Sequence, residues 1–189
     1  LGEFVVQRGA DAPQRALQAL RALTQRHTAE WALRPFIERH PELTFATLAA
    51  WSTDASAHVR RLASEGSRPR LPWGLQLKSL ITDPSATLPI LAALQDDPSD
   101  YVRRSVANHL NDIAKDHPQL VVQWVVTELP QAAPPLRALL RHASRTLIKR
   151  GDAGMLKAWG LGARFKGETR LSLSAQRVPI GESFAIEVV

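Results

Sequence analysis

A short, proline-stiffened loop holds the densest set of chemically useful side chains in the sequence. The stretch Ser64-Glu-Gly-Ser-Arg-Pro-Arg-Leu-Pro-Trp73 contains one carboxylate, two arginines and a tryptophan: Glu65, Arg68, Arg70 and Trp73. Proline limits the conformational entropy that a loop loses on ordering, so such a loop can present its side chains rigidly, as a recognition site requires. In the alternative, structural interpretation, Trp73 begins the next helix and packs inward while Glu65 pairs with Arg61.

A second group of candidate residues is purely cationic. One predicted helix carries a basic side chain at every fourth position: Arg137, Arg141, Arg145 and Lys149. Like charges at this spacing repel by roughly a few tenths of a kcal/mol per pair, so three such pairs in a row suggest a use. Phosphates along a groove are the natural anionic partner, and a solvated helix face is the alternative.

A third group mixes cations with polar and acidic side chains on a predicted helix over residues 99–115. The stripe expected to be buried consists of Val102, Val106, Leu110 and Ile113, and the adjacent face carries Arg104, Asn108, Asp112 and Lys115. A helix 43 residues earlier places Arg61 and Glu65 at the positions that match Arg104 and Asn108. Two stacked helices therefore present arginines beside carboxylates.

Composition and missing motifs narrow the function classes. The 24 Lys and Arg residues exceed the 18 Asp and Glu residues, which gives a net charge of +6 and favours a polyanionic partner such as nucleic acid. The absence of cysteine excludes disulfides and thiolate zinc sites and fits an intracellular setting. The histidines show no metal-ligand spacing, and the common nucleophile, phosphate-loop and dinucleotide motifs are absent. We therefore expect no metal, no cofactor and, without an apolar run of about 20 residues, no membrane partner.

The elements that position these side chains are mainly helices. Leucine and alanine recur at helical spacing between regularly placed prolines. The predicted helices lie near residues 13–26, 28–39, 43–52, 56–66, 72–82, 86–95, 99–115, 119–128, 135–149 and 153–159.

An internal repeat indicates the architecture. The stretch Asp54-Ala-Ser-Ala-His-Val-Arg-Arg61 aligns with Asp97-Pro-Ser-Asp-Tyr-Val-Arg-Arg104, 43 residues later, with five of eight positions identical. Helix pairs that repeat at about this period predict an all-α, HEAT-like repeat solenoid, an α-α superhelix with a concave face. We interpret four repeat residues as braces between loop and helix rather than as site residues: Asp54, Asp97, Arg60 and Arg103.

The C-terminal segment has a different pattern. From about residue 162, apolar residues alternate with polar ones, first at Leu171 and Leu173 and then at Phe184, Ile186 and Val188, which we expect to face inward. This period of two, with a turn between, predicts two strands, and an isolated hairpin is barely stable. We therefore predict a helical domain over residues 1–160 and the start of a β domain, or a β tail, over residues 161–189.

Three stretches carry a resemblance to a known family. The stretches 24–36, 64–73 and 101–118 are similar to the bacterial alkylpurine DNA glycosylases of the AlkC and AlkD superfamily, and closer to AlkC. The segment Val178-Pro-Ile-Gly-Glu-Ser183 resembles the start of the immunoglobulin-like domain that many AlkC proteins carry. By motif position, the resemblance places the family's active-site acids at Glu30, Glu65 and Asp112 and its aromatic residue at Trp73.

The resemblance implies a DNA-repair enzyme that excises 3-methyladenine and 3-methylcytosine from duplex DNA without flipping the lesion into a deep pocket. The residue types agree, because carboxylates can stabilise an oxocarbenium-like sugar and position a water. Cationic and polar residues would hold the DNA: Arg61, Arg68, Arg70, Arg104, Asn108, Lys115, Arg137, Arg141, Arg145 and Lys149. We expect a monomer in the bacterial cytoplasm, associated with the nucleoid when bound to DNA. The alternatives are a HEAT-repeat protein scaffold and a DNA-binding relative that has lost excision.

Overall fold

The protein is described by a computed structural model that covers residues 1–162 and 167–188. The helices are α1 (Gly2–Arg8), α2 (Pro13–Thr24), α3 (Glu30–Arg39), α4 (Pro41–Trp51), α5 (Ala57–Gly66), α6 (Lys78–Thr82), α7 (Leu88–Leu94), α8 (Asp100–Ile113), α9 (Pro118–Glu128), α10 (Pro134–Ala143), α11 (Arg145–Arg150) and α12 (Ala153–Ala158). Short 3-10 turns at Ser85–Thr87 and Leu129–Gln131 join some of them. In this part of the chain, every helix is too short or too polar to cross a bilayer.

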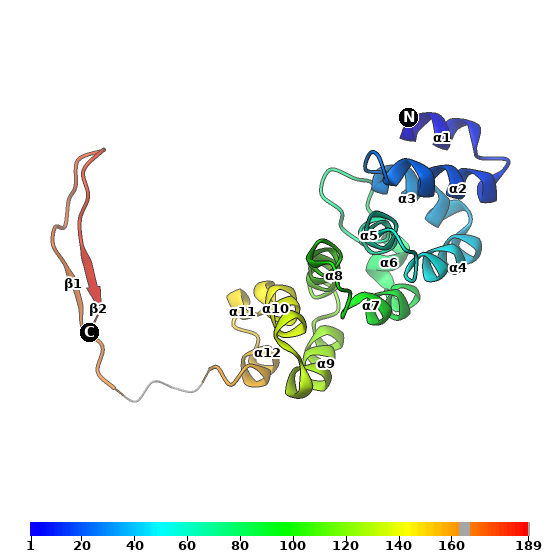
Figure 1. The fold of residues 1–189 in the computed structure, drawn as a ribbon. Coiled ribbons are helices and arrows are strands. Elements are labelled where there is room, and N and C mark those ends of the chain that lie inside the picture. The colour runs from blue at the N-terminus through cyan, green and yellow to red at the C-terminus, as the bar shows by residue number, and fades with distance from the viewer. Residues whose placement is uncertain (163–166, 189) are drawn as a thin grey trace.

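The helices stack in the order of the sequence, which confirms the predicted all-α, HEAT-like solenoid. Helix α5 packs on α8 and α8 packs on α10, so the matching helices of successive repeats lie side by side (Figure 1). Helices α5, α8 and α10 form one layer of the solenoid. Helices α4 and α7 belong to the other layer and contact each other, and α3 packs on α5. The stripe predicted for α8 is buried, with Val102, Val106 and Leu110 fully inaccessible. Each such side chain stabilises the stack by about 1.5–3 kcal/mol.

The repeated Asp and Arg residues brace the loops against the helices that follow, as predicted, since Arg60 donates to the Asp54 carbonyl at 2.8 Å and Arg103 to the Asp97 carbonyl at 2.5 Å. They also link neighbouring repeats, which was not predicted. Arg60 donates two hydrogen bonds to Asp97, from Nε to Oδ2 at 2.6 Å and from Nη2 to Oδ1 at 3.0 Å. One repeat earlier, Arg21 forms the equivalent ion pair with Asp54 at 2.5 Å. Asp97 also accepts the backbone N–H of Ser99, which secures the turn into α8. Each aspartate therefore caps its own loop and binds the preceding repeat.

Most predicted helices begin and end within two residues of the observed ones, with three exceptions. Helix α1 was not predicted. The helix expected to start at residue 72 begins at Lys78, because Trp73 adopts a left-handed conformation with φ of 56° that a helix cannot contain. The helix expected over 135–149 is divided at Ser144. There the N–H of Thr146 donates to the side chain of Asn111 at 3.2 Å, which diverts it from the helical ladder.

The C-terminal strands pair as a hairpin. β1 (Leu171–Leu173) runs antiparallel to β2 (Ile186–Val188), with Leu171 opposite Val188. The prediction that one face points inward is wrong for the described residues, because Phe184, Ile186 and Val188 are 48%, 58% and 68% exposed. Two three-residue strands have too little apolar area to form a core of their own.

Candidate active site

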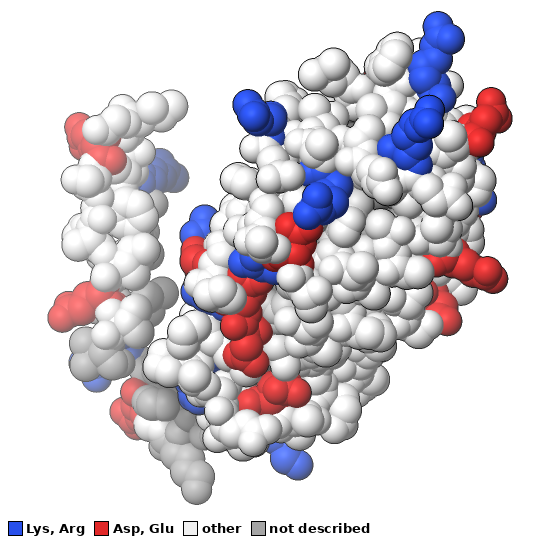
Figure 2. Space-filling view, turned by 45° about the vertical axis from the view of Figure 1, so that its right-hand side comes forward, with Lys and Arg blue, Asp and Glu red and all other residues white. Residues whose placement is uncertain are grey.

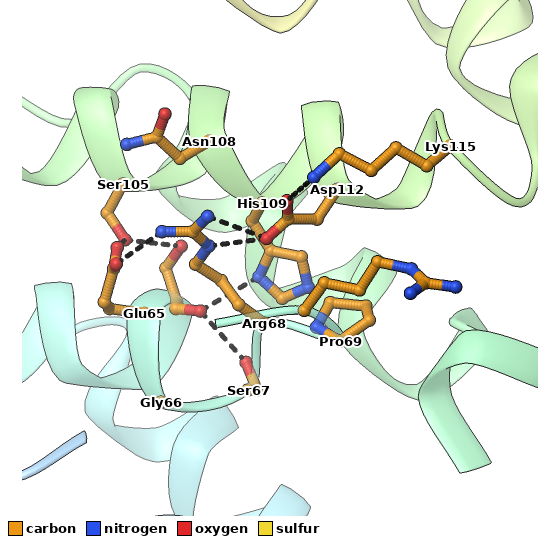
Figure 3. Close-up of polar contacts among 12 residues, drawn as sticks. Glu65, Gly66, Ser67, Arg68, Pro69, Ser105, Asn108, His109, Asp112 and Lys115 are labelled. Carbon is orange, nitrogen blue, oxygen red and sulfur yellow. Dashed lines mark hydrogen bonds and ion pairs between the residues drawn. The ribbon is translucent and has the colours of Figure 1, made fainter. Parts of the chain in front are cut away.

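A buried arginine joins two of the predicted acids. Arg68, in the turn after α5, donates from Nη1 to Glu65 Oε1 at 2.6 Å. It also donates from Nε and Nη2 to Oδ2 of Asp112 on α8, at 2.8 and 2.7 Å (Figure 3). Lys115 Nζ binds the other Asp112 oxygen at 2.8 Å. Residues 44 positions apart thus meet because α5 and α8 stack.

The third predicted acid joins the same network through a second arginine. Arg61 Nη1 donates to Glu30 Oε1 at 2.7 Å, and Arg61 Nη2 lies 3.6 Å from Glu65 Oε1. The Arg61 guanidinium also stacks over the Tyr101 ring, 5.2 Å from its centroid. Glu30 Oε2 is buried and has no hydrogen-bond partner in the described part of the chain. The three acids therefore differ: Glu65 and Asp112 have both oxygens engaged, and Glu30 keeps one acceptor.

The loop that carries Arg68 is held in place by Arg34, a residue that the sequence analysis missed. Arg34 is fully buried, and Nη1 donates to the carbonyls of Gly66 and Arg68 at 3.0 and 2.8 Å. Its other nitrogens donate to the carbonyls of Pro69 and Leu75. Burial and the nearby Arg68 lower the pKa of Arg34 to about 10, so the side chain remains charged at neutral pH. One cation thus fixes the loop from residue 66 to residue 75.

The end of α5 lies unusually close to α3. A Cβ added at Gly66 would lie 2.4 Å from a methyl carbon of Leu33, so a larger residue would force the buried Leu33 side chain to move. This close approach brings Glu65 toward Glu30 and leaves the Gly66 carbonyl within reach of Arg34. The glycine in the loop motif therefore permits this close packing of α5 against α3.

A cleft of about 810 Å³ opens beside the network. Its charged lining includes four residues of the network, Glu30, Arg61, Glu65 and Arg68, together with Glu3 of α1. Its rim carries two exposed indoles, Trp73 at 94% and Trp31 at 60% exposure. The structural interpretation of Trp73 as an inward-packing helix start is therefore wrong, and Trp31 is a second aromatic that the sequence analysis missed. Asp112 does not line this cleft, because it lies behind Arg68 with 1% exposure.

The acids dominate the electrostatics of the site. Burial lowers the pKa of Arg68, but the charges and hydrogen bonds of Glu65 and Asp112 outweigh it and the net shift is upward. His109, fully buried on α8, has its pKa lowered to about 3 by burial, although its bond to the Ser64 carbonyl acts in the opposite direction. His109 is therefore neutral and Arg68 is charged over the whole physiological range.

The predicted DNA-binding residues fall into two groups. Some are tied to neighbours: Arg61 and Arg68 hold the acids, Arg70 pairs with Asp116 at 2.8 Å, and Arg145 donates to Asn108 at 3.2 Å. Lys115 is partly exposed and binds Asp112 at 2.8 Å. The others are exposed, namely Arg104, Arg137, Arg141 and Lys149, and Arg104 pairs with Asp100 of its own helix at 2.7 Å.

The predicted four-residue ridge is split by the division at Ser144. The guanidinium carbons of Arg137 and Arg141 lie 5.6 and 5.2 Å from the centroid of the Trp159 ring. Arg145 instead binds Asn108 of α8, and Lys149 is exposed. On the face drawn in Figure 2, acidic side chains gather in a band with basic side chains beside it. No group of three or more His, Asp and Glu side chains suited to a metal ion occurs among residues 1–162 and 167–188.

Comparison with known proteins shows the family of the chain. The sequence pattern of a family described as DNA alkylation repair enzyme matches residues 15–147. The chain belongs to this family. The match runs from within α2 to within α11 and includes every acid of the network, which confirms the resemblance drawn from the sequence.

Two known proteins are closely similar to this chain. The uncharacterized protein YhaZ of Bacillus subtilis (strain 168) is 44% identical over 186 residues, which are 96% of this chain and 51% of that protein. The alkylpurine DNA glycosylase AlkC of Pseudomonas fluorescens, solved bound to DNA containing an abasic site analog, has 40% identity and a TM-score of 0.88. That match covers 100% of this chain and 52% of that chain, so the chain spans about half the length of both relatives.

Proposed function

We propose that this chain forms the catalytic helical part of a DNA N-glycosylase that excises cationic N3-alkylated bases, such as 3-methyladenine and 3-methylcytosine, from duplex DNA. The observation that carries the proposal is the meeting of Glu30, Glu65 and Asp112 in one ion-pair network, beside a cleft whose rim carries an exposed tryptophan. Membership of the repair family and the similarity to a glycosylase solved with DNA support it.

The reaction suits a site that has acids but needs no strong proton donor. When the C1′–N bond breaks, the bonding electron pair goes to the cationic base, which leaves as a neutral molecule. The sugar becomes an oxocarbenium-like cation that nearby carboxylates stabilise. The oxygen of a water molecule then bonds to C1′, and its proton passes to a carboxylate and on to solvent. The products are the free base and an abasic site.

The three acids have different roles in this proposal. Glu30 retains an acceptor oxygen, Oε2, and so positions the water. Glu65 lines the cleft with both oxygens engaged, which fixes its orientation, and it stabilises the sugar cation. Asp112 lies behind Arg68 and contributes negative potential while holding that arginine in place.

The aromatic rim faces the damaged base. A cation next to an indole ring gains about 0.5–2 kcal/mol, depending on how far both are desolvated. Trp73 is held outward on a loop fixed by Arg34 and therefore reaches the DNA without a rearrangement of the core. The cleft is open to solvent at its rim, and this openness favours attack on a lesion that stays in the duplex over capture in a deep pocket.

Phosphates of the DNA backbone would meet the exposed cations. Arg104, Arg137, Arg141 and Lys149 have exposed side chains, and the Trp159 ring orders two of them. Lys115 and Arg70 are partly exposed, and Arg145 with Asn108 forms a polar pair between α8 and α11. We assign Arg61 and Arg68 to the orientation of the acids. We further propose that the hairpin over residues 171–188 belongs to a β domain distinct from the helical unit.

Base release from methylated duplex DNA in buffer containing EDTA tests the proposal. Release of N3-methylated bases, with abasic sites left in the DNA, is the expected result. Salt-dependent DNA binding without release would favour a relative that has lost excision. The absence of both base release and DNA binding would favour a protein scaffold. Because the relatives are about twice as long, the assay should be run on both this chain and the full-length protein.

A further inference from the structure

Three buried polar side chains of helix α8 point toward the C-terminal end of α5. Ser105, His109 and Asp112 follow one another at steps of four and three residues, so they share one face of the helix. Their exposed fractions are 3%, 0% and 1%. An all-apolar face would pack α5 more simply, since each buried polar group must be satisfied by a partner. Their partners are therefore informative.

Each of the three side chains binds a different part of the segment that carries Glu65. Ser105 Oγ lies 2.6 Å from Glu65 Oε2, the His109 ring nitrogen Nδ1 lies 2.9 Å from the carbonyl of Ser64, and Asp112 binds Arg68 (Figure 3). Because His109 is neutral and faces a carbonyl, Nδ1 carries the proton and donates. The face thus fixes the backbone before Glu65, the carboxylate itself and the arginine after it.

The direction of the Ser105 hydrogen bond follows from its neighbours. A carboxylate oxygen only accepts, so the Ser105 hydroxyl donates its single proton to Glu65. The Ser64 hydroxyl lies 3.0 Å from Ser105 Oγ and can donate in turn to that oxygen. Bonds to a charged acceptor are about twice as strong as neutral ones, and this one is short and buried. Arg68 holds Glu65 Oε1 and Ser105 holds Oε2, so the carboxylate plane is fixed from both sides.

We propose that Ser105 is a positioning residue for the excision reaction: its hydroxyl aligns the Glu65 carboxylate with the cleft. This inference rests on the proposed glycosylase function. Ser105 does not line the cleft and acts on the reaction only through Glu65. Loss of alignment in an otherwise intact site lowers the rate of the chemical step and leaves DNA affinity unchanged, because the cations proposed to bind phosphates are exposed or partly exposed side chains and Ser105 is buried.

The substitution S105A removes the hydroxyl and little volume, so the variant should fold. Under single-turnover conditions on duplex DNA with one 3-methyladenine, we expect the excision rate to fall about 10- to 100-fold, with the Kd for the DNA within twofold of the wild-type value. S105T keeps the hydroxyl and should recover most of the rate. S67A is the matched control, because Ser67 is equally buried near Glu65 and, among the described residues, its hydroxyl donates to backbone carbonyls of α5 alone.

The outcomes separate the two levels of the proposal. An S105A rate equal to that of the wild type, or an equal loss in S67A, would overturn the positioning role while leaving the glycosylase assignment intact. A rate loss accompanied by a parallel rise in Kd would also overturn it, because that pattern indicates general damage to the site. A wild-type chain and full-length protein without any excision would overturn the proposed function, and the role of Ser105 with it.

Discussion

The neutral, buried His109 makes a quantitative prediction about stability and pH. Its Nδ1–H donates to the Ser64 carbonyl, and both burial and the nearby cations Arg68 and Arg34 disfavour a charge on the ring. The substitution H109N removes the titrating group and keeps an amide N–H that can reach the same carbonyl. The cavity left by the smaller side chain should lower the stability of the variant by a roughly constant amount at every pH.

The pH-dependent part follows from the pKa of about 3 in the folded protein, compared with 6.5 for an unperturbed histidine. Below about pH 6.5 the unfolded wild-type chain takes up a proton at His109 and the folded chain does not, so acid favours the unfolded state. The stability that the neutral ring confers is therefore present above pH 6.5 and is lost as the pH falls toward 3. Each pH unit in this window is worth about 1.4 kcal/mol, or about 3 kcal/mol over two units.

Urea denaturation followed by circular dichroism, at several values between about pH 7.5 and 4.5, measures this effect. Other titrating groups, such as Asp97 and Asp116, are present in both proteins and cancel in the difference. The free energy of unfolding of the wild type should exceed that of H109N most at pH 7.5, and this gap should shrink by about 3 kcal/mol toward pH 4.5. A gap that stays constant over this range would refute the assignment of His109 as a buried neutral ring.

Two further substitutions test the rim and the exposed cations. W73A should leave the free energy of unfolding within about 0.5 kcal/mol, because the indole is 94% exposed, and should slow excision of a cationic base roughly 2- to 30-fold in a single-turnover assay; an unchanged rate would remove Trp73 from the site. The double substitution R137A/R141A should weaken DNA binding and lower the slope of log K against log salt by about two, measured by fluorescence anisotropy. An unchanged slope would show that these arginines do not meet phosphates.

The architecture could be predicted from the sequence because its determinants repeat. Asp54 and Asp97 recur at a fixed interval, and the ion pairs of Arg21 and Arg60 show that each aspartate links neighbouring repeats. The acids of the site were placed by resemblance to a family, since an isolated glutamate in a helix has many uses. Their meeting in space required the stacking of α5 on α8, which brings Arg68 to an aspartate 44 residues away.

Helical periodicity could not predict the residues that support the site, Arg34 and Ser105. Arg34 lies among the buried residues of α3, and a periodic pattern with one charged member is read as an interruption rather than as a structural cation. Its partners are backbone carbonyls, which leave no trace in side-chain types. The role of Ser105 could not be predicted from the sequence either, because it depends on a contact with the neighbouring helix. The prediction of one continuous basic ridge was wrong for a related reason. The four-residue spacing assumed an unbroken helix over residues 135–149, but Asn111, 35 residues before Thr146, accepts the Thr146 N–H and interrupts that helix.

The proposed function requires the Glu65 carboxylate to take part in bond cleavage rather than in DNA binding. The most direct measurement is abasic-site formation at a single 3-methyladenine in duplex DNA by the wild type and by E65Q, with the Kd for the same DNA measured in parallel. We expect excision by the wild type, and for E65Q a rate at least about 100-fold lower with a Kd within a few fold of the wild-type value. Excision by E65Q at the wild-type rate would contradict it.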